Sequence, residues 1–70
     1  MSTGDRLIYM ANQIAKNLAA RGDEEAIGIT ADHIKAYWDP LMRSRVADLL
    51  AQRSDEFSPI AAEAVRRIHS

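Results

Sequence analysis

Apolar residues recur every three or four positions along nearly the whole chain, which is the spacing of a helix face. No stretch alternates apolar and polar residues as a half-buried strand would. This pattern excludes a sheet protein and predicts an all-α fold. The residues that it predicts to be buried fall into four groups: Leu7, Met10, Ala11, Ile14, Ala15 and Leu18; Ile27, Ala31, Ile34 and Trp38; Met42, Val46, Leu49 and Leu50; and Ile60, Ala61, Ala64, Val65 and Ile68.

Two prolines, each preceded by a residue that commonly caps helices, set the boundaries in the second half of the chain. A residue before proline avoids the helical region, whereas proline fits the first position of a helix. Asp39-Pro40 therefore predicts that one helix ends near Trp38 and that Asp39 caps the next, which begins at Pro40. Ser58-Pro59 predicts the same arrangement at the start of the last helix.

Capping signals also divide the first half of the chain into two helices. Thr3 is a plausible cap for the first helix, and Asp5 suits the positive end of its dipole. Gly22 stands where a glycine would end that helix, and Asp23 can cap the second. Short connections favour helices that pack on their neighbours, and the proline corner leaves too little slack for an antiparallel hairpin. We therefore predict a single domain over residues 1–70, built as a small orthogonal bundle of about four short helices.

Charge and cysteine content exclude several kinds of protein. The 70 residues include nine Lys and Arg against ten Asp and Glu, for a net charge of −1, and no cysteine. The lack of cysteine rules out disulfides, cysteine-based zinc sites and a thiol nucleophile. The balanced charge gives no electrostatic reason to expect nucleic acid or an anionic membrane as a partner. No apolar run reaches the length of a membrane span, so we expect a small soluble domain in the cytoplasm.

The residue types that usually carry catalysis are poorly placed in this chain. A helical metal pair would need a second ligand three or four residues from His33, and none is there. The adjacent carboxylates Glu24 and Glu25 would diverge on a helix rather than share a proton. No glycine-rich phosphate loop is present. We therefore expect no catalytic, cofactor-binding or metal-binding residues in this chain and no enzymatic activity of its own.

A second set of residues lies outside the predicted core stripes and is a candidate binding surface. Exposed aromatic and apolar side chains are favoured at the centres of interfaces, although isolated ones occur on any surface. The pattern therefore favours a protein-binding surface over incidental exposure. The residues are Tyr9, Asn12 and Gln13 in the first helix, and Ile29, His33 and Tyr37 in the second.

Two other functions stay open. Arg43, Arg45 and Arg53 make the third helix mildly basic, as in a helix-turn-helix regulator that reads DNA. Asp48 in the same helix and the lack of a basic arm argue against it. The other function is a free-standing homo-oligomeric bundle, since so small a chain buries little core by itself.

Two segments of the chain resemble a known family. Residues 10–15 (Met-Ala-Asn-Gln-Ile-Ala) and residues 33–43 (His-Ile-Lys-Ala-Tyr-Trp-Asp-Pro-Leu-Met-Arg) are similar to the delta subunit of NAD-dependent formate dehydrogenase. The second segment is the more specific, and the spacing of the two segments and the Ala-rich last helix also match. The chain departs from the family at Tyr37 and Leu41, where Phe and Arg are common choices.

The resemblance implies a non-catalytic accessory subunit of a cytoplasmic formate dehydrogenase. In such complexes the large alpha subunit carries a molybdenum or tungsten pterin and iron–sulfur clusters, and beta and gamma subunits pass electrons to FMN and NAD. The delta chain would pack on the alpha subunit and support its assembly, cofactor insertion or stability.

The resemblance also assigns roles to individual residues. Trp38, Asp39 and Pro40 would form a rigid structural corner, with Trp38 wedged between helices. His33, Tyr37 and Arg43, on the flank of that corner, would contact the alpha subunit. The amides of Asn12 and Gln13 would either hydrogen-bond a partner's backbone or face water.

Overall fold

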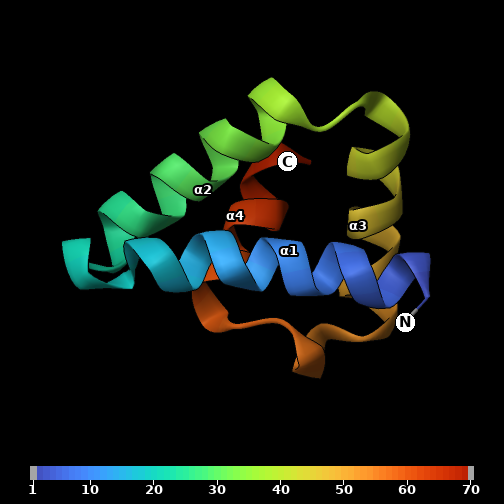
Figure 1. The fold of residues 1–70 in the computed structure, drawn as a ribbon, viewed down its shortest axis with the longest axis horizontal. Helices are drawn as coiled ribbons and strands as arrows, with labels where there is room; N and C mark the ends of the chain where they lie inside the picture. The colour runs from blue at the N-terminus through green and yellow to red at the C-terminus, as the bar shows by residue number, and fades with distance from the viewer. Residues whose placement is uncertain (1, 70) are drawn as a thin grey trace.

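The computed structural model describes residues 2–69, and α-helices joined by short turns make up most of them (Figure 1). In Figure 1, α1 crosses the front of the molecule, α3 turns sharply away from α2, and α4 lies behind α1. No strand occurs within residues 2–69, so the prediction of an all-α bundle of four helices is confirmed. The elements in chain order are α1 (Thr3–Leu18), a 3₁₀ turn η1 (Ala19–Arg21), α2 (Asp23–Tyr37), α3 (Pro40–Gln52), a second 3₁₀ turn η2 (Ser54–Glu56) and α4 (Pro59–Ile68).

Both proline boundaries lie where the sequence predicts them. Asp39 and Ser58 have extended backbones, as residues before proline prefer, and the helices begin at Pro40 and Pro59. The Asp39 carboxylate accepts a hydrogen bond from the backbone N–H of Met42 at 2.8 Å, and the Ser58 hydroxyl accepts one from Ala61 at 3.2 Å. Each cap satisfies a donor that the helix itself cannot satisfy.

Two predicted caps in the first half are wrong. Ser2, not Thr3, caps α1, because its hydroxyl accepts from the backbone of Asp5 while the Asp5 carboxylate accepts from the backbone of Ser2. Gly22 does end the first helical segment, with a positive φ of 95°, after the chain tightens into η1. Gly22 is also the residue before α2, so Asp23 is already helical and its side chain caps nothing.

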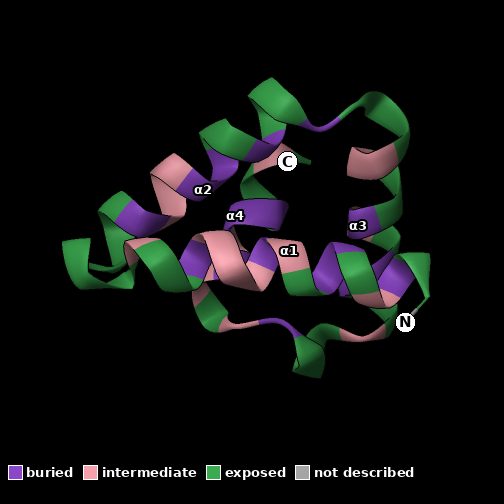
Figure 2. Cartoon of the chain, viewed as in Figure 1, coloured by how far each residue is buried: buried purple, intermediate pink, exposed green. Residues whose placement is uncertain are grey.

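The core lies where the four helices meet (Figure 2). Its buried members are Leu7, Ile8, Ala11, Ala15, Ile34, Trp38, Val46, Leu49, Leu50, Phe57, Ala61, Ala62 and Val65, and Met10, Ile14, Met42, Ile60 and Ile68 are partly buried against them. Thus most of the predicted stripe residues do contribute to the core.

The buried arcs of α1 and α2 are rotated slightly from their predicted positions. On α1, Ile8 is buried and Leu18 only partly so. On α2, Ala26 and Thr30 are fully buried, while Ile27 is half-buried. The physical reason is that α2 packs on α4 as well as on α1, so positions between the two contacts are the ones covered. Within residues 2–69, no helix is long and apolar enough to cross a membrane.

Candidate partner-binding site

The α2–α3 corner, which we define as residues 37–41, is built around a buried tryptophan. Trp38 is only 4% exposed and belongs to the core, and its backbone N–H donates to the Ile34 carbonyl to close α2. Trp38 and Asp39 are both extended, which turns the chain before Pro40 starts α3. The aromatic side chain therefore anchors the turn from the inside, and the proline and its cap fix the direction in which α3 leaves.

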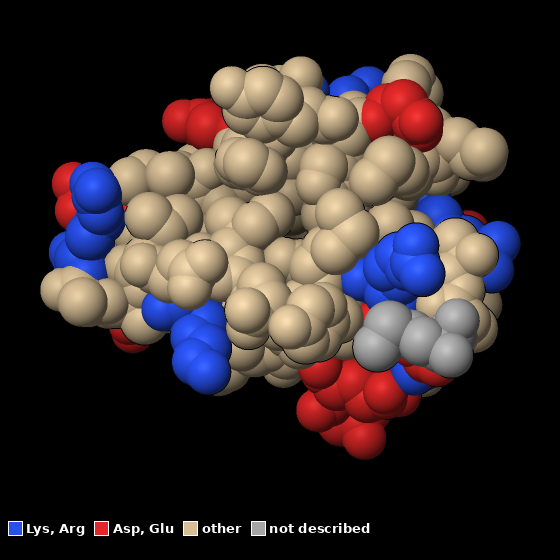
Figure 3. All heavy atoms as spheres, in the orientation of Figure 1, with Lys and Arg blue, Asp and Glu red and all other residues tan. Residues whose placement is uncertain are grey.

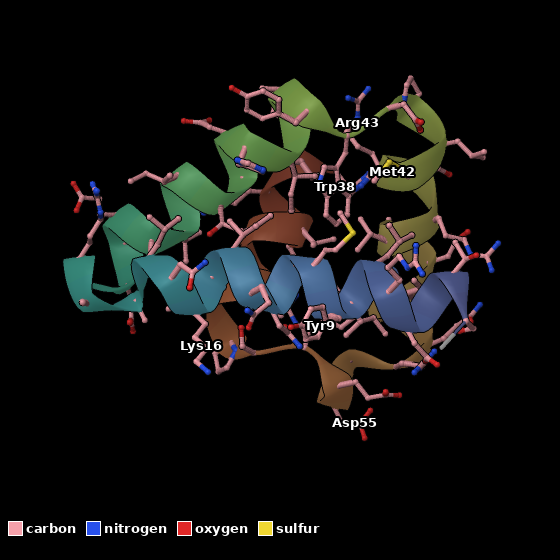
Figure 4. The ribbon with its side chains drawn as sticks, in the orientation of Figure 1. Tyr9, Lys16, Trp38, Met42, Arg43 and Asp55 are labelled. Carbon is pink, nitrogen blue, oxygen red and sulfur yellow. The ribbon has the colours of Figure 1, made fainter. Side chains whose placement is uncertain are left out.

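Arg43, in the first turn of α3, stabilises the same corner through hydrogen bonds to α2 and Trp38. Its Nη1 donates to the carbonyl oxygen of Trp38 at 2.7 Å and to that of Lys35 at 3.2 Å. These carbonyls lie at the C-terminal end of α2, where a cation is favourable. Figure 4 shows Arg43, Trp38 and Met42 together at this corner. The sequence analysis did not predict these intrachain bonds, and contact of Arg43 with a partner subunit stays a prediction.

The corner includes the two most exposed large apolar residues of the described chain. Tyr37, which precedes the buried Trp38 in the chain, is 76% exposed, and Leu41, which follows it, is 79% exposed. The ring of His33, one turn earlier on α2, lies 4.8 Å from the ring of Tyr37 at a tilt of 43°. Ile29, a further turn back, is half-buried. The structure thus brings together Ile29, His33 and Tyr37 along one outer face of α2, as their spacing predicts.

Tyr9 is 55% exposed and belongs to a separate part of the surface, on α1 (Figure 4). His33 and Tyr37 form the one ring contact among residues 2–69, so the ring of Tyr9 stacks on neither. Figure 3 shows that uncharged residues cover the middle of the face over α1 and α2, with Lys, Arg, Asp and Glu at its margins. Tyr9 is therefore an exposed position separate from the ring pair of His33 and Tyr37. The face of the molecule over α1 and α2 carries few charges in its middle.

Asn12 has a role inside the chain that the sequence analysis missed. Its Nδ2 donates to the carbonyl oxygen of Glu56, and its Oδ1 accepts from the backbone N–H of Ser58, both at 2.9 Å. The amide therefore ties α1 to the segment between η2 and α4. The sequence analysis expected the Asn12 amide to bond a partner or to face water and did not predict these two intrachain bonds; contact of Asn12 with a partner stays a prediction. The buried Phe57 lies between the two bonded residues, in a loop where helical periodicity gives no signal.

Gln13, next to Asn12, stays half-buried and lines a groove of about 610 Å³. The groove lies between α1 and the start of α4, and Lys16, Asp23 and Ile60 also line it. Its walls are mainly apolar, with one basic and one acidic residue among them. None of the corner residues lines this groove, so it is a feature separate from the α2–α3 corner.

An ion-pair network joins the N-terminal end of α1 to the end of α3. Arg53 Nη2 lies 2.6 Å from Asp5 Oδ1, and Arg53 Nε lies 2.6 Å from Glu56 Oε2. Hydrogen bonds from Arg53 hold the pKa values of the Asp5 and Glu56 carboxyl groups below their usual range. The same bonds raise the pKa of the Arg53 guanidinium, and the bond to Glu56 has the larger effect. A second bridge, from Arg67 Nη2 to Glu24 Oε1 at 2.7 Å, joins α4 to α2. These contacts support the fold and lie away from the corner.

The described part of the chain holds no cluster of metal-binding side chains. Among residues 2–69, no group of three or more His, Asp and Glu could hold a metal ion. The arrangement of the exposed residues suits contact with another protein, through a rigid corner and apolar side chains that project from it.

Comparison with known proteins identifies the family. Residues 6–65 match the family described as NADH-dependent formate dehydrogenase delta subunit FdsD, a span that includes the corner, the Asn12 link and the Arg53–Glu56 pair but not Asp5. No curated protein and no solved structure matches the chain. The match covers most of the 70 residues, so the chain belongs to the family of NADH-dependent formate dehydrogenase delta subunits.

Proposed function

We propose that this chain is a non-catalytic accessory subunit that packs on the large catalytic subunit of a formate dehydrogenase. The family match over residues 6–65 carries the proposal, because a delta subunit works within a complex. In that complex the chain would support assembly of the large subunit, insertion of its cofactors, or its stability.

The surface of the chain supports a binding role. One outer face of α2 consists of Tyr37, His33 and Ile29. On α1, two further candidate contact residues are Tyr9 and Gln13. Aromatic residues are enriched where proteins bind one another. A rigid surface of this kind loses little conformational freedom when it binds.

The redox chemistry would belong to the other subunits. We propose that the alpha subunit holds a molybdenum or tungsten pterin with iron–sulfur clusters, and that beta and gamma subunits carry electrons to FMN and NAD in the cytoplasm. The described residues of this chain do not fit a metal centre, since no cluster of three suitable side chains exists among them. Its contribution is therefore proposed to be packing alone.

The proposal is tested by making the complex with and without this chain. Cells that lack the chain should yield less metal-loaded enzyme, while formate turnover per loaded site stays near normal. Mass spectrometry measures the metal content and so the amount of loaded enzyme. The formate-oxidising activity divided by that amount gives the turnover per loaded site. Fully loaded and fully active enzyme from such cells would contradict the proposal. A large fall in turnover per loaded site would show instead that the chain takes part in the reaction.

A further inference from the structure

We infer that the groove between α1 and the start of α4 receives a short extended segment of the large catalytic subunit, and that this segment carries one acidic and one basic residue. The acidic residue pairs with Lys16 and the basic residue with Asp23. The inference rests on the proposed function, and it names both a docking position on this chain and the chemistry of the segment that fills it.

The size of the groove suits a peptide segment. Its volume is about 610 Å³, against about 150 Å³ for the hollow beside Leu41 between α1 and α3. Its lining runs along α1 and into η1 from Asn12 to Ala19, a length of roughly 10 Å at the helical rise of about 1.5 Å per residue. An extended chain advances about 3.3 Å per residue, so about three or four residues span the groove.

The walls of the groove are mainly apolar. Ala15, Ala19, Pro59 and Ile60 supply small or aliphatic surface from α1, η1 and the first turn of α4. A segment that covers this surface removes it from water, which favours binding. The part of the segment between its two charged residues is therefore expected to be apolar.

Two opposite charges line the same groove without pairing with each other. Within residues 2–69, neither the Lys16 ammonium nor the Asp23 carboxylate makes a hydrogen bond or an ion pair. Arg53 and Arg67, in contrast, pair with carboxylates of this chain. A segment with a carboxylate for Lys16 and a cation for Asp23 satisfies both charges, whereas an uncharged segment would displace their water without replacing its contacts.

The two walls of the groove are fixed to each other in the chain by itself. Asn12, in the α1 wall, donates to the Glu56 carbonyl oxygen and accepts from the backbone N–H of Ser58, both at 2.9 Å. The Ser58 hydroxyl, in the opposite wall, accepts from the backbone N–H of Ala61 and caps α4. Figure 4 shows Lys16 extending from α1 on the side where the chain enters α4. Because the groove is already formed, most of the conformational freedom lost on binding is that of the segment.

The test measures binding of purified chain variants to the purified large subunit. Lys16→Glu and Asp23→Lys each place a like charge against the segment, so each should weaken binding about tenfold or more. The matched controls are Lys35→Glu and Glu25→Lys. Lys35 is also in the last turn of its helix, and Glu25 shares the first turn of α2 with Asp23, but neither lines the groove. Each control should change the dissociation constant less than about threefold.

A third variant, Ala19→Trp, tests the groove without a change of charge. Ala19 is exposed and lines the groove, so an indole there fills part of the space and should also weaken binding about tenfold or more. Ala20 is exposed and does not line the groove, so Ala20→Trp adds the same group outside it and should have little effect. Thermal melts of all these variants should stay close to that of the unchanged chain, since the substituted residues are exposed.

The outcomes separate the inference from the proposed function. If the unchanged chain does not bind the large subunit, the proposed function fails and the inference fails with it. If the unchanged chain binds and the groove variants bind as tightly as their controls, the proposed function stands and the groove is not the docking position. If Ala19→Trp alone weakens binding, the segment lacks the two charges and the inference is overturned. If the groove variants instead dissociate a dimer of the isolated chain in light scattering and leave subunit binding intact, the groove joins two copies, which also overturns the inference.

Discussion

Arg53 and Asp5 lie 48 positions apart in the sequence, yet the Arg53 Nη2 and the Asp5 Oδ1 are 2.6 Å apart. The contact closes the bundle by joining the first turn of α1 to the residue that ends α3. Asp5 also completes the capping box of α1, so one carboxylate serves both a helix end and a tertiary contact.

The Arg53 contacts predict a pH-dependent difference between the unchanged chain and Arg53→Ala. Hydrogen bonds from Arg53 lower the pKa of Asp5 and of Glu56 in the folded state. A lowered folded pKa gives stability that is present above the unfolded pKa, near 4, and is lost as pH falls through the folded pKa. Arg53→Ala should therefore lower the melting temperature by a few degrees at pH 7, and the difference should shrink below pH 4.

Salt provides the control for that prediction. The groups are partly exposed, so the difference at pH 7 should also shrink at 1 M salt, where screening is strong. A difference that stays constant from pH 7 to pH 3 would mean that Arg53 acts by packing and not through its carboxylate partners.

Asn12→Ala should destabilise the fold by about 1–3 kcal/mol, because two hydrogen bonds of roughly 0.5–1.5 kcal/mol each are lost. The loss is partly offset by the higher helix propensity of alanine. Urea denaturation measures the change, and Asn17→Ala is the matched control, since Asn17 is exposed on the same helix. Equal stability of the two variants would show that the Asn12 link to Glu56 and Ser58 contributes nothing measurable.

Local signals in the sequence are enough to predict the helices but not the links between them. Periodicity and the two Asp/Ser-Pro pairs give the starts of α3 and α4, because capping and proline geometry act over a few residues. The Asn12 and Arg53 contacts depend on which loops meet after folding, and no local pattern encodes that. Arg43 is an intermediate case: an arginine in the first turn after a proline corner can reach the preceding helix end, and that spacing could have suggested its role.

For the candidate site, too, the sequence predicts some features and only the structure shows the others. Spacing on α2 predicts that Ile29, His33 and Tyr37 share an outer face, and the ring contact agrees. Their binding to a subunit stays a prediction. The exposure of Leu41 and the hollow beside it depend on how α1 and α3 pack, and only the structure shows them.

Two glycines should respond in opposite ways to the same substitution. Gly22 has a φ of 95°, which residues with a side chain rarely adopt, so Gly22→Ala should destabilise the fold by about 1 kcal/mol or more. Gly28 lies inside α2, and an added Cβ meets nothing within 4 Å. Gly28→Ala should therefore stabilise the fold by about 0.5–1 kcal/mol. Thermal melts of the two variants compare the effects directly, and a shift of the same sign in both would contradict the assignment.

Thr30→Val should raise the stability of the chain. Thr30 is fully buried, and its hydroxyl oxygen has no hydrogen-bond partner among residues 2–69. Valine has nearly the same shape without the polar atom, so the expected gain is about 1 kcal/mol, within the range measured for buried unpaired groups. Thr30→Ser, which keeps the hydroxyl and removes a methyl group, is the control and should lower the urea midpoint. A lower midpoint for Thr30→Val as well would show that the hydroxyl has a partner in solution.

Trp38 offers the most direct test of the corner as a part of the core. It is the chain's single tryptophan and is 4% exposed, so its fluorescence should shift to longer wavelength when the chain unfolds. Trp38→Ala removes a large buried side chain and should cost about 3–5 kcal/mol, which is most of the stability of so small a domain. Trp38→Phe keeps an aromatic group in the same place and should remain folded. Circular dichroism distinguishes the two outcomes, and a fully helical Trp38→Ala with an unchanged melting temperature would mean that the corner does not depend on its tryptophan.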